Sequence, residues 1–138
     1  MAMSPEEIEA FLDLRLVGAL GTLRADGSPW VVPIWYRWDG TKIKVWTGPT
    51  MGWVKRLREE PRVGFTVFEH DTPRRAVYFR GIASVREGTM RELDDDIRAI
   101  TARYVEPARL DEVIRSYDRG GNKVVVTMTP TFLKGEFN

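Results

Sequence analysis

Residues 20–57, LGTLRADGSPWVVPIWYRWDGTKIKVWTGPTMGWVKRL, carry the strongest fold signal in this chain. Three runs rich in β-forming residues alternate with turn signals at Ala25-Asp26-Gly27 and Asp39-Gly40, where glycine can adopt a positive φ. The runs are Val17–Arg24, Trp30–Tyr36 and Lys42–Thr47. We therefore predict an antiparallel meander of three strands, followed by a basic helix.

The remaining sequence predicts further strands with helices around them. Ser4-Pro5-Glu6-Glu7 has the composition of a capping box, and Ile8, Phe11 and Leu12 would form the buried face of the helix that it starts. The predicted strands are Val63–Phe68, Ala76–Val85 with a bend at Gly81, Lys123–Thr129, and a short strand or tail over Thr131–Phe137. The predicted helices are Trp53–Glu60, Arg91–Val105 and Leu110–Tyr117. The expected fold class is mainly β (α+β), with six main strands.

Length and composition set broad limits on function. A chain of 138 residues is expected to form one domain, residues 1–138. The net charge of +1 indicates neither a nucleic-acid nor a membrane partner, and the absence of cysteine excludes disulfides and thiolate metal sites. The acidic N-terminus lacks a signal-peptide pattern, and no apolar run is long enough to cross a membrane. We expect a soluble cytoplasmic protein.

The order of three segments resembles a known family. GTLRADGSPWVVPIWY, DGTKIKVWTG and VKRLREEPRVGFTV follow one another as in the pyridoxamine 5′-phosphate oxidase-like family, the split β-barrel superfamily of flavin- and deazaflavin-binding proteins. The likeness covers nearly the whole chain. It implies a six-stranded antiparallel split β-barrel with flanking helices, of the FMN-binding type. It also implies a homodimer that holds its cofactor in a groove between the subunits.

Side chains suited to catalysis are few. The lone histidine, His70, lies in a polar turn segment, and Asp94, Asp95 and Asp96 would point apart on a helix. There is no Gly-x-Ser-x-Gly elbow. The sequence therefore predicts no metal site and assigns no catalytic residue. In the resembled family the cofactor carries the chemistry.

The phosphate-binding pattern of the family is altered here. The flavoprotein pattern is an aromatic-Thr pair, three residues, then Ser-Arg-Lys, whereas this chain has Trp46-Thr47 and then Met51, Gly52 and Trp53. Two cations and a hydroxyl that would meet a phosphate are thus absent. Lys55 and Arg56 follow one turn later and would supply charge. The resemblance implies that Thr47, Lys55 and Arg56 reach the phosphate region.

Trp30, Val31, Val32 and Pro33 would lie along the cofactor ring on the same resemblance. Their run shows little alternation of polarity, which favours a strand covered on both faces by a ligand or a partner subunit. Pro33 either marks an edge, bulge or break that frees backbone groups for a ligand, or merely bends the strand.

Trp53 and Arg80 complete the candidate site. Trp53 could stack on the ring, pack in the core or dimer interface, or block the ordinary phosphate site. Arg80 lies in an apolar strand, where a charge needs a partner or a ligand.

These observations favour an oxidoreductase. It would bind FMN or coenzyme F420, of which we favour F420, at a homodimer interface, and transfer a hydride to or from a small organic substrate. The alternative is a non-catalytic binder or carrier of flavin, deazaflavin or haem, favoured by the altered phosphate site. A third hypothesis, a basic single-strand nucleic-acid binder, would need a larger positive excess than +1.

Overall fold

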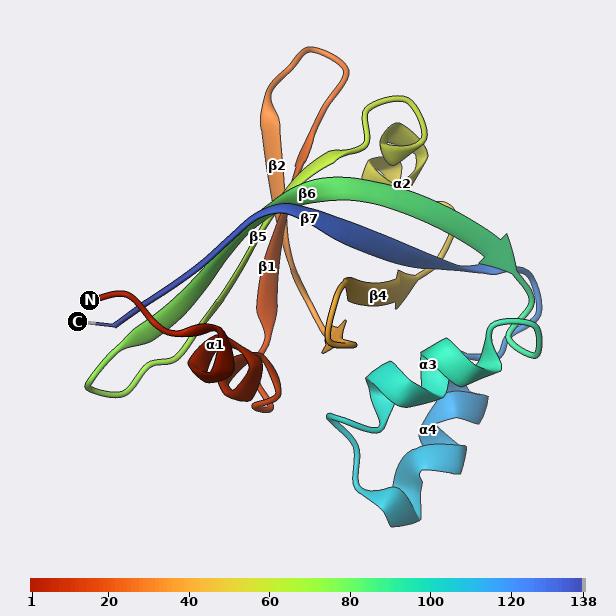
Figure 1. The fold of residues 1–138 in the computed structure, drawn as a ribbon. Helices are drawn as coiled ribbons and strands as arrows, with labels where there is room; N and C mark the ends of the chain where they lie inside the picture. Colours follow the sequence, from red (N-terminus) through yellow and green to blue (C-terminus); the bar gives the residue numbers. More distant parts are fainter. Residues whose placement is uncertain (138) are drawn as a thin grey trace.

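The fold is an antiparallel sheet flanked by short helices (Figure 1). The computed structural model describes residues 1–137, and within them seven strands join one sheet in the order β2-β1-β5-β6-β7-β4-β3. The strands are β1 Gly18–Leu23, β2 Pro29–Ile34, β3 Arg37–Trp38, β4 Ile43–Thr47, β5 Arg62–Phe68, β6 Arg75–Gly88 and β7 Lys123–Phe137. The helices are α1 Pro5–Leu12, α2 Gly52–Leu57, α3 Asp94–Thr101 and α4 Leu110–Tyr117, with a 3₁₀ turn, η1, over Pro107–Arg109.

The predicted three-strand meander is wrong in its pairing. β2 pairs with β1, but β4 pairs with β7 and with the two-residue β3, which the sequence did not indicate. Only Trp35 and Tyr36 separate β2 from β3, although these strands stand at opposite ends of the sheet order. The sheet must therefore curl until its two edges approach, which gives the split barrel. The edges stay unpaired, so hydrogen bonds do not close the described sheet.

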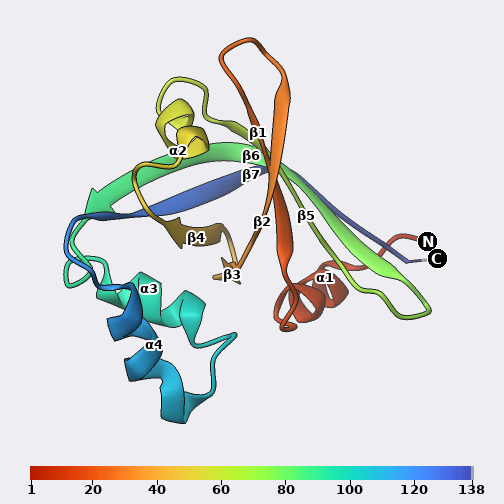
Figure 2. The same ribbon diagram turned by 180° about the vertical axis from the view of Figure 1, so that it is seen from behind.

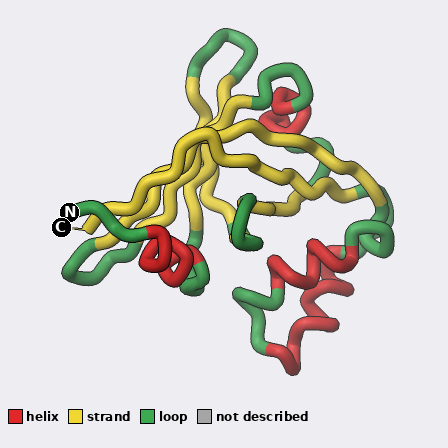
Figure 3. The backbone as a smooth tube through the Cα atoms, in the orientation of Figure 1, coloured by secondary structure: helices red, strands yellow, loops and turns green. Residues whose placement is uncertain are grey.

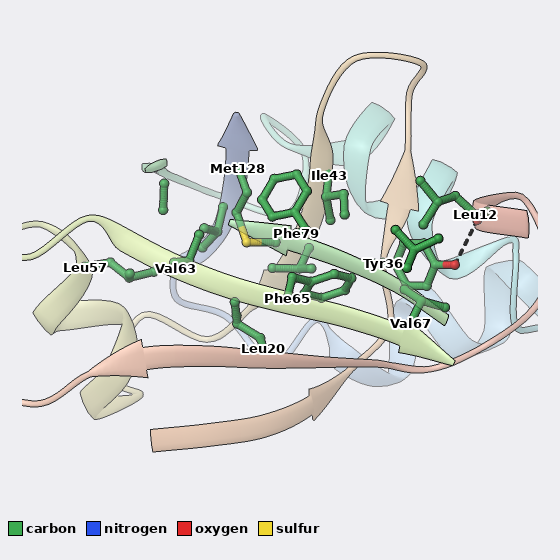
Figure 4. Close-up of a cluster of buried hydrophobic side chains, with 14 of the residues drawn as sticks. Leu12, Leu20, Tyr36, Ile43, Leu57, Val63, Phe65, Val67, Phe79 and Met128 are labelled. Carbon is green, nitrogen blue, oxygen red and sulfur yellow. Dashed lines mark hydrogen bonds between the residues drawn. The ribbon is translucent and has the colours of Figure 1, made fainter. Parts of the chain in front are cut away.

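Tyr36 fixes the crossing from one edge to the other. Its side chain is fully buried, and its hydroxyl donates to the Leu12 carbonyl at 2.8 Å (Figure 4). Burial raises the pKa of this phenol, which keeps it protonated as a donor. Pro33 lies in the edge strand β2, as one of its predicted alternatives required, since proline cannot donate to a second ladder.

The long pair β6–β7 runs through a bulge. Arg80 faces Phe132 while Gly81 faces Pro130, so Thr131 is the extra residue. The bend predicted at Gly81 is thus confirmed as a shift in register. The two segments predicted over Lys123–Thr129 and Thr131–Phe137 are one strand, β7, because the bulge accommodates Pro130 between them.

The predicted helices are present: α4 has the predicted bounds, Leu110–Tyr117, whereas α2 and α3 differ at their ends. The capping box of Ser4 and Glu7 is present and begins α1. α2 ends at Leu57 and not at Glu60, and α3 covers Asp94–Thr101 and not Arg91–Val105. Reciprocal hydrogen bonds between Thr89 and Glu92 form a turn immediately ahead of α3. None of the described helices is long and apolar enough to cross a membrane.

Two apolar clusters hold these elements together. The larger lies inside the curled sheet and includes Leu20, Ile43, Phe65, Phe79 and Met128 (Figure 4). The smaller lies under α3 and α4 and consists of Met90, Leu93, Ile97, Ile114 and Val125, with Trp46 and Leu110 packed against it. The views from front and back place α3 and α4 together (Figures 2 and 3), and Arg103, just after α3, donates to the carbonyl of Leu12 at the end of α1 at 3.4 Å.

Candidate cofactor-binding groove

A groove of about 1150 Å³ opens at the split of the barrel. β2 and the end of β1 form one side, and the end of β4 with α2 forms the other. The last residue of α4 and the first of β7 complete it. Its lining includes Val17, Thr22, Arg24, Trp30, Val32, Pro33, Ile34, Trp35, Trp46, Thr47, Met51, Trp53, Lys55, Arg56, Glu59, Tyr117 and Lys123. This volume exceeds the usual range for one small-molecule ligand.

The charge in the groove is positive. Arg24, Lys55, Arg56 and Lys123 line it against a single carboxylate, that of Glu59, which pairs with Arg56 at 2.7 Å. The Nε of Arg56 is buried and has no hydrogen-bond partner among the described residues. A buried donor left unpaired costs about 1–3 kcal/mol, so an anion bound here would relieve that cost. The donor set fits a phosphate or carboxylate ligand.

Aromatic side chains supply most of the apolar surface. Four of the five tryptophans line the groove: Trp30, Trp35, Trp46 and Trp53. The Arg24 guanidinium lies over the Trp30 ring at 5.5 Å from its centroid. Trp53 also packs against the main core, which agrees with one of its three predicted roles. The fifth, Trp38, points elsewhere and donates to the Glu9 carboxylate at 2.8 Å.

The structure brings together most of the residues predicted from the sequence. Seven line the groove: Trp30, Val32, Pro33, Thr47, Trp53, Lys55 and Arg56. The other two, Val31 and Arg80, lie in a shallower hollow of about 370 Å³ with Tyr78 and Phe132. Successive side chains on a strand alternate between faces, which separates Val31 from Trp30 and Val32. Arg80 is exposed, with its guanidinium 4.6 Å from the Phe132 ring centroid.

Sequence reasoning missed several lining residues. Tyr117 and Lys123 reach the groove because Thr47 pairs with Val124, which brings the end of α4 and the start of β7 beside β4. Pairing between strands far apart in the chain leaves no local sequence signal, so Tyr117 and Lys123 could not be predicted as lining residues. Arg24 carried a local signal, since it precedes the Asp-Gly turn of the β1–β2 hairpin and therefore lies at the hairpin tip.

Groups for other chemistries lie elsewhere or are paired. His70 is exposed in the turn between β5 and β6. Asp94 pairs with Arg98, and Asp96 pairs with Lys44 at 3.2 Å. Within residues 1–137, no three His, Cys, Asp or Glu side chains gather as a metal site would require. It is the four cations and four tryptophans of the groove that suit it to a flat, anionic molecule.

Comparisons with known proteins identify the class. The family model described as pyridoxamine 5′-phosphate oxidase matches residues 4–134, so the chain belongs to this family. Among solved structures, the conserved hypothetical protein Rv2991 from Mycobacterium tuberculosis is 26% identical, with a TM-score of 0.77 over 95% of this chain and 82% of its own. The split barrel predicted from the sequence is thereby confirmed, with seven strands in place of six. None of the curated proteins matches this chain.

Solved relatives in this fold bind several redox groups. An F420 reductase is 24% identical, with a TM-score of 0.69 over 91% of this chain and 94% of its own. An FAD-binding protein from Mesorhizobium loti is 19% identical, with a TM-score of 0.73 over 100% of this chain and 97% of its own. The heme storage protein HutZ from Vibrio cholerae is 21% identical, with a TM-score of 0.70 over 96% and 94%. The same fold thus occurs in proteins described as an F420 reductase, an FAD-binding protein and a heme storage protein.

Proposed function

We propose that this protein is a cytoplasmic oxidoreductase that binds FMN or coenzyme F420 in the groove and transfers a hydride to or from a small organic substrate. One observation carries the proposal: a groove at the split of the barrel combines four cations with four tryptophans. The bound cofactor would supply the hydride from its ring. The protein's part is to bind, orient and shield that ring.

Trp30, Val32 and Pro33 are the groups proposed to lie along the ring. They belong to β2, whose outer edge has no strand partner among residues 1–137. An edge strand of this kind offers backbone N–H and C=O groups to a polar ring edge. Thr47, Lys55 and Arg56 are proposed to meet the phosphate, with Arg24 beside them.

The distribution of charge favours F420 over FMN. Met51, Gly52 and Trp53 occupy the positions where the family's Ser-Arg-Lys would gather on one phosphate. The cations of this chain instead come from separate elements: the β1–β2 hairpin, α2 and the start of β7. Spread cations suit a ligand with several anionic groups along its length, as in the acidic tail of F420.

A second copy of the chain is proposed to cover the outer face, defined by Val31, Tyr78, Arg80, Ile82 and Phe132. Its four apolar members are 39–63% exposed, which is unusual for neighbouring large side chains. The hollow in this face is lined by the small residues Ala19, Gly21 and Gly64, so another surface can approach its backbone closely. Since β2 separates this face from the groove, a dimer here would cover Val31 while a cofactor covers Trp30.

The carrier function is the second candidate. No histidine or cysteine lines the groove, and no carboxylate other than Glu59 does so, within residues 1–137. An enzyme whose cofactor does the chemistry is compatible with this lining, and so is a protein that only stores its ligand.

The decisive experiment is a titration of the purified protein with FMN and with F420 separately, in which tryptophan fluorescence is the signal. A ring bound along Trp30, Val32 and Pro33 should quench part of the groove's tryptophan fluorescence, with micromolar or tighter affinity. Reoxidation of the reduced, bound cofactor by a panel of organic acceptors then separates enzyme from carrier. Failure of both cofactors to bind at micromolar concentration would remove the oxidoreductase proposal.

A further inference from the structure

Trp35, at one end of the groove, is held by Tyr104. The two rings stack with centroids 4.7 Å apart and an interplanar angle of 6°. The Tyr104 hydroxyl donates to the Leu16 carbonyl at 2.7 Å and accepts from the Tyr36 backbone N–H at 3.2 Å. Tyr104 is itself buried and does not line the groove. One face of Trp35 is therefore fixed from behind.

Trp46 is held by Thr101 in a comparable way. The indole Nε1 donates to the Thr101 hydroxyl at 3.1 Å, and that hydroxyl donates to the Ile97 carbonyl at 2.6 Å. Thr101 is fully buried behind the tryptophan. Tyr117 contacts Trp46 edge to face, with centroids 5.2 Å apart. This second wall is also fixed from behind.

One turn of chain holds both tryptophans. The backbone N–H of Tyr104 donates to the Thr101 carbonyl at 3.0 Å, so the two supporting residues are neighbours. Trp35 and Trp46 come from β2's end and from β4, on the two sides of the split. The last residue of α3 and the turn after it thus set the position of Trp46 and Trp35.

This aromatic end differs from the end that holds Arg24, while a further cation, Lys123, lies beside β4 because the next residue, Val124, pairs with Thr47. Arg24 and Trp30 lie at the turn end of the β1–β2 hairpin, where Leu23 pairs with Pro29, while Trp35 lies beyond the opposite end, where Gly18 pairs with Ile34. Trp30 and Trp35 are five positions apart, which in an extended chain is a distance of roughly 16 Å. The groove volume of about 1150 Å³ exceeds the usual range for one small-molecule ligand, which leaves room for a second ligand beside a cofactor.

We infer that the aromatic end, lined by Val17, Trp35, Trp46 and Tyr117, is the substrate subsite and takes a flat, uncharged aromatic molecule. This inference rests on the proposed function, in which the cofactor's anionic part occupies the end that holds Arg24. Rigid aromatic walls favour planar ligands, because stacking needs parallel faces and little ordering entropy is lost on binding. Thr101 and Tyr104 are the positioning residues of this subsite.

Equilibrium dialysis with 2-naphthol, and with the non-planar decahydro-2-naphthol as the matched control, tests the inference. Wild-type protein should bind 2-naphthol roughly ten-fold more tightly than the saturated analogue, with and without saturating FMN or F420. Trp35→Leu and Thr101→Val should each weaken 2-naphthol binding about five-fold while cofactor affinity stays within two-fold. Thr101→Ser, which keeps the hydroxyl, should bind like the wild type.

Arg56→Gln provides the reciprocal control, since it should weaken cofactor binding and leave 2-naphthol binding unchanged. Equal affinity for the two naphthols, displacement of 2-naphthol by cofactor, or wild-type binding in Trp35→Leu would overturn the inference. If Thr101→Val fails to fold, Trp35→Leu still decides it. Loss of FMN and F420 binding with intact 2-naphthol selectivity would remove the proposed function and leave the aromatic subsite standing.

Discussion

At the scale of single residues, Arg56 is the most informative side chain. The family's Ser-Arg-Lys positions hold Met51, which is 49% exposed, Gly52, and Trp53, which packs on the core, so none supplies charge. Arg56 lies one helical turn further on and lines the groove, and its buried Nε has no hydrogen-bond partner among the described residues. A cation one helical turn after the family's phosphate-binding positions can still bind an anionic group of the ligand, provided that the ligand extends to it.

Replacing Arg56 should therefore weaken cofactor binding selectively. We expect Arg56→Gln to raise the Kd for F420 or FMN at least ten-fold, since hydrogen bonds to charged groups contribute about 1.5–3 kcal/mol. Arg58→Gln is the matched control, because Arg58 pairs with Glu87 at 2.9 Å and does not line the groove. Fluorescence titration of both variants is the measurement, and equal losses would count against a direct contact from Arg56.

At the scale of elements, the β6–β7 pair is the longest ladder of the sheet and depends on a glycine. A Cβ at Gly81 would lie 2.4 Å from the Thr129 carbonyl oxygen, which belongs to the paired backbone and cannot move aside alone. The bulge therefore leaves no room for a side chain at its centre.

Gly81→Ala should accordingly destabilise the fold by about 1–3 kcal/mol, the range for overpacked sites. Gly48→Ala is the control, because a Cβ there meets nothing within 4 Å. Urea unfolding of both variants measures the difference. If the Gly81→Ala variant proved as stable as the wild type, the ladder would have to shift to accommodate the methyl group, contrary to this expectation.

The Glu7 carboxylate at the start of α1 is expected to make the free energy of unfolding depend on pH in the acid range. Hydrogen bonds from the Ser4 backbone and side chain lower the pKa of Glu7 below its ordinary value of 4.5. A lowered folded-state pKa contributes stability above the ordinary value, which is lost as pH falls through the folded value. Glu7→Gln, which keeps a capping acceptor, should flatten the pH dependence of unfolding below pH 4.5. Parallel curves for both proteins would contradict this.

At the scale of the whole molecule, the outer face predicts assembly. Val31→Glu places a charge among Tyr78 and Phe132 and should convert a dimer of twice 15.9 kDa into a monomer. Leu14→Glu is the control, because Leu14 is similarly apolar and 41% exposed but lies between α1 and β1. Light scattering during gel filtration measures the mass. A monomeric wild type would remove the proposed interface.

The sequence predicted what short-range chemistry determines. The capping box at Ser4 and the glycine turns at Gly27 and Gly40, with φ of 83° and 100°, follow from residues close together in the chain. The resemblance to a family then predicted the split barrel. Seven of nine proposed site residues share the groove because they belong to one hairpin, the end of β4 and one helix.

Long-range pairing accounts for what the sequence missed. Lys42–Thr47 reads as the neighbour of Trp30–Tyr36, yet β4 pairs with β7, far later in the chain (Val45 with Val126). Tyr117 and Lys123 enter the groove through that pairing, and Thr101 and Tyr104 support it from behind. No spacing of residues within a short window reports such contacts.

The two-residue crossing between β2 and β3 has a consequence for folding. Because these strands occupy opposite ends of the sheet, the groove, which has β2 and β1 on one side and β4 with α2 on the other, exists only after β5, β6 and β7 have joined β1 to β4 in order. A ligand in the groove therefore binds only the complete sheet and stabilises it as a whole. At a hundred-fold excess over Kd it adds about 2.7 kcal/mol against global unfolding. Slower amide exchange should then extend to β5 and β6, strands that contribute no residue to the groove lining.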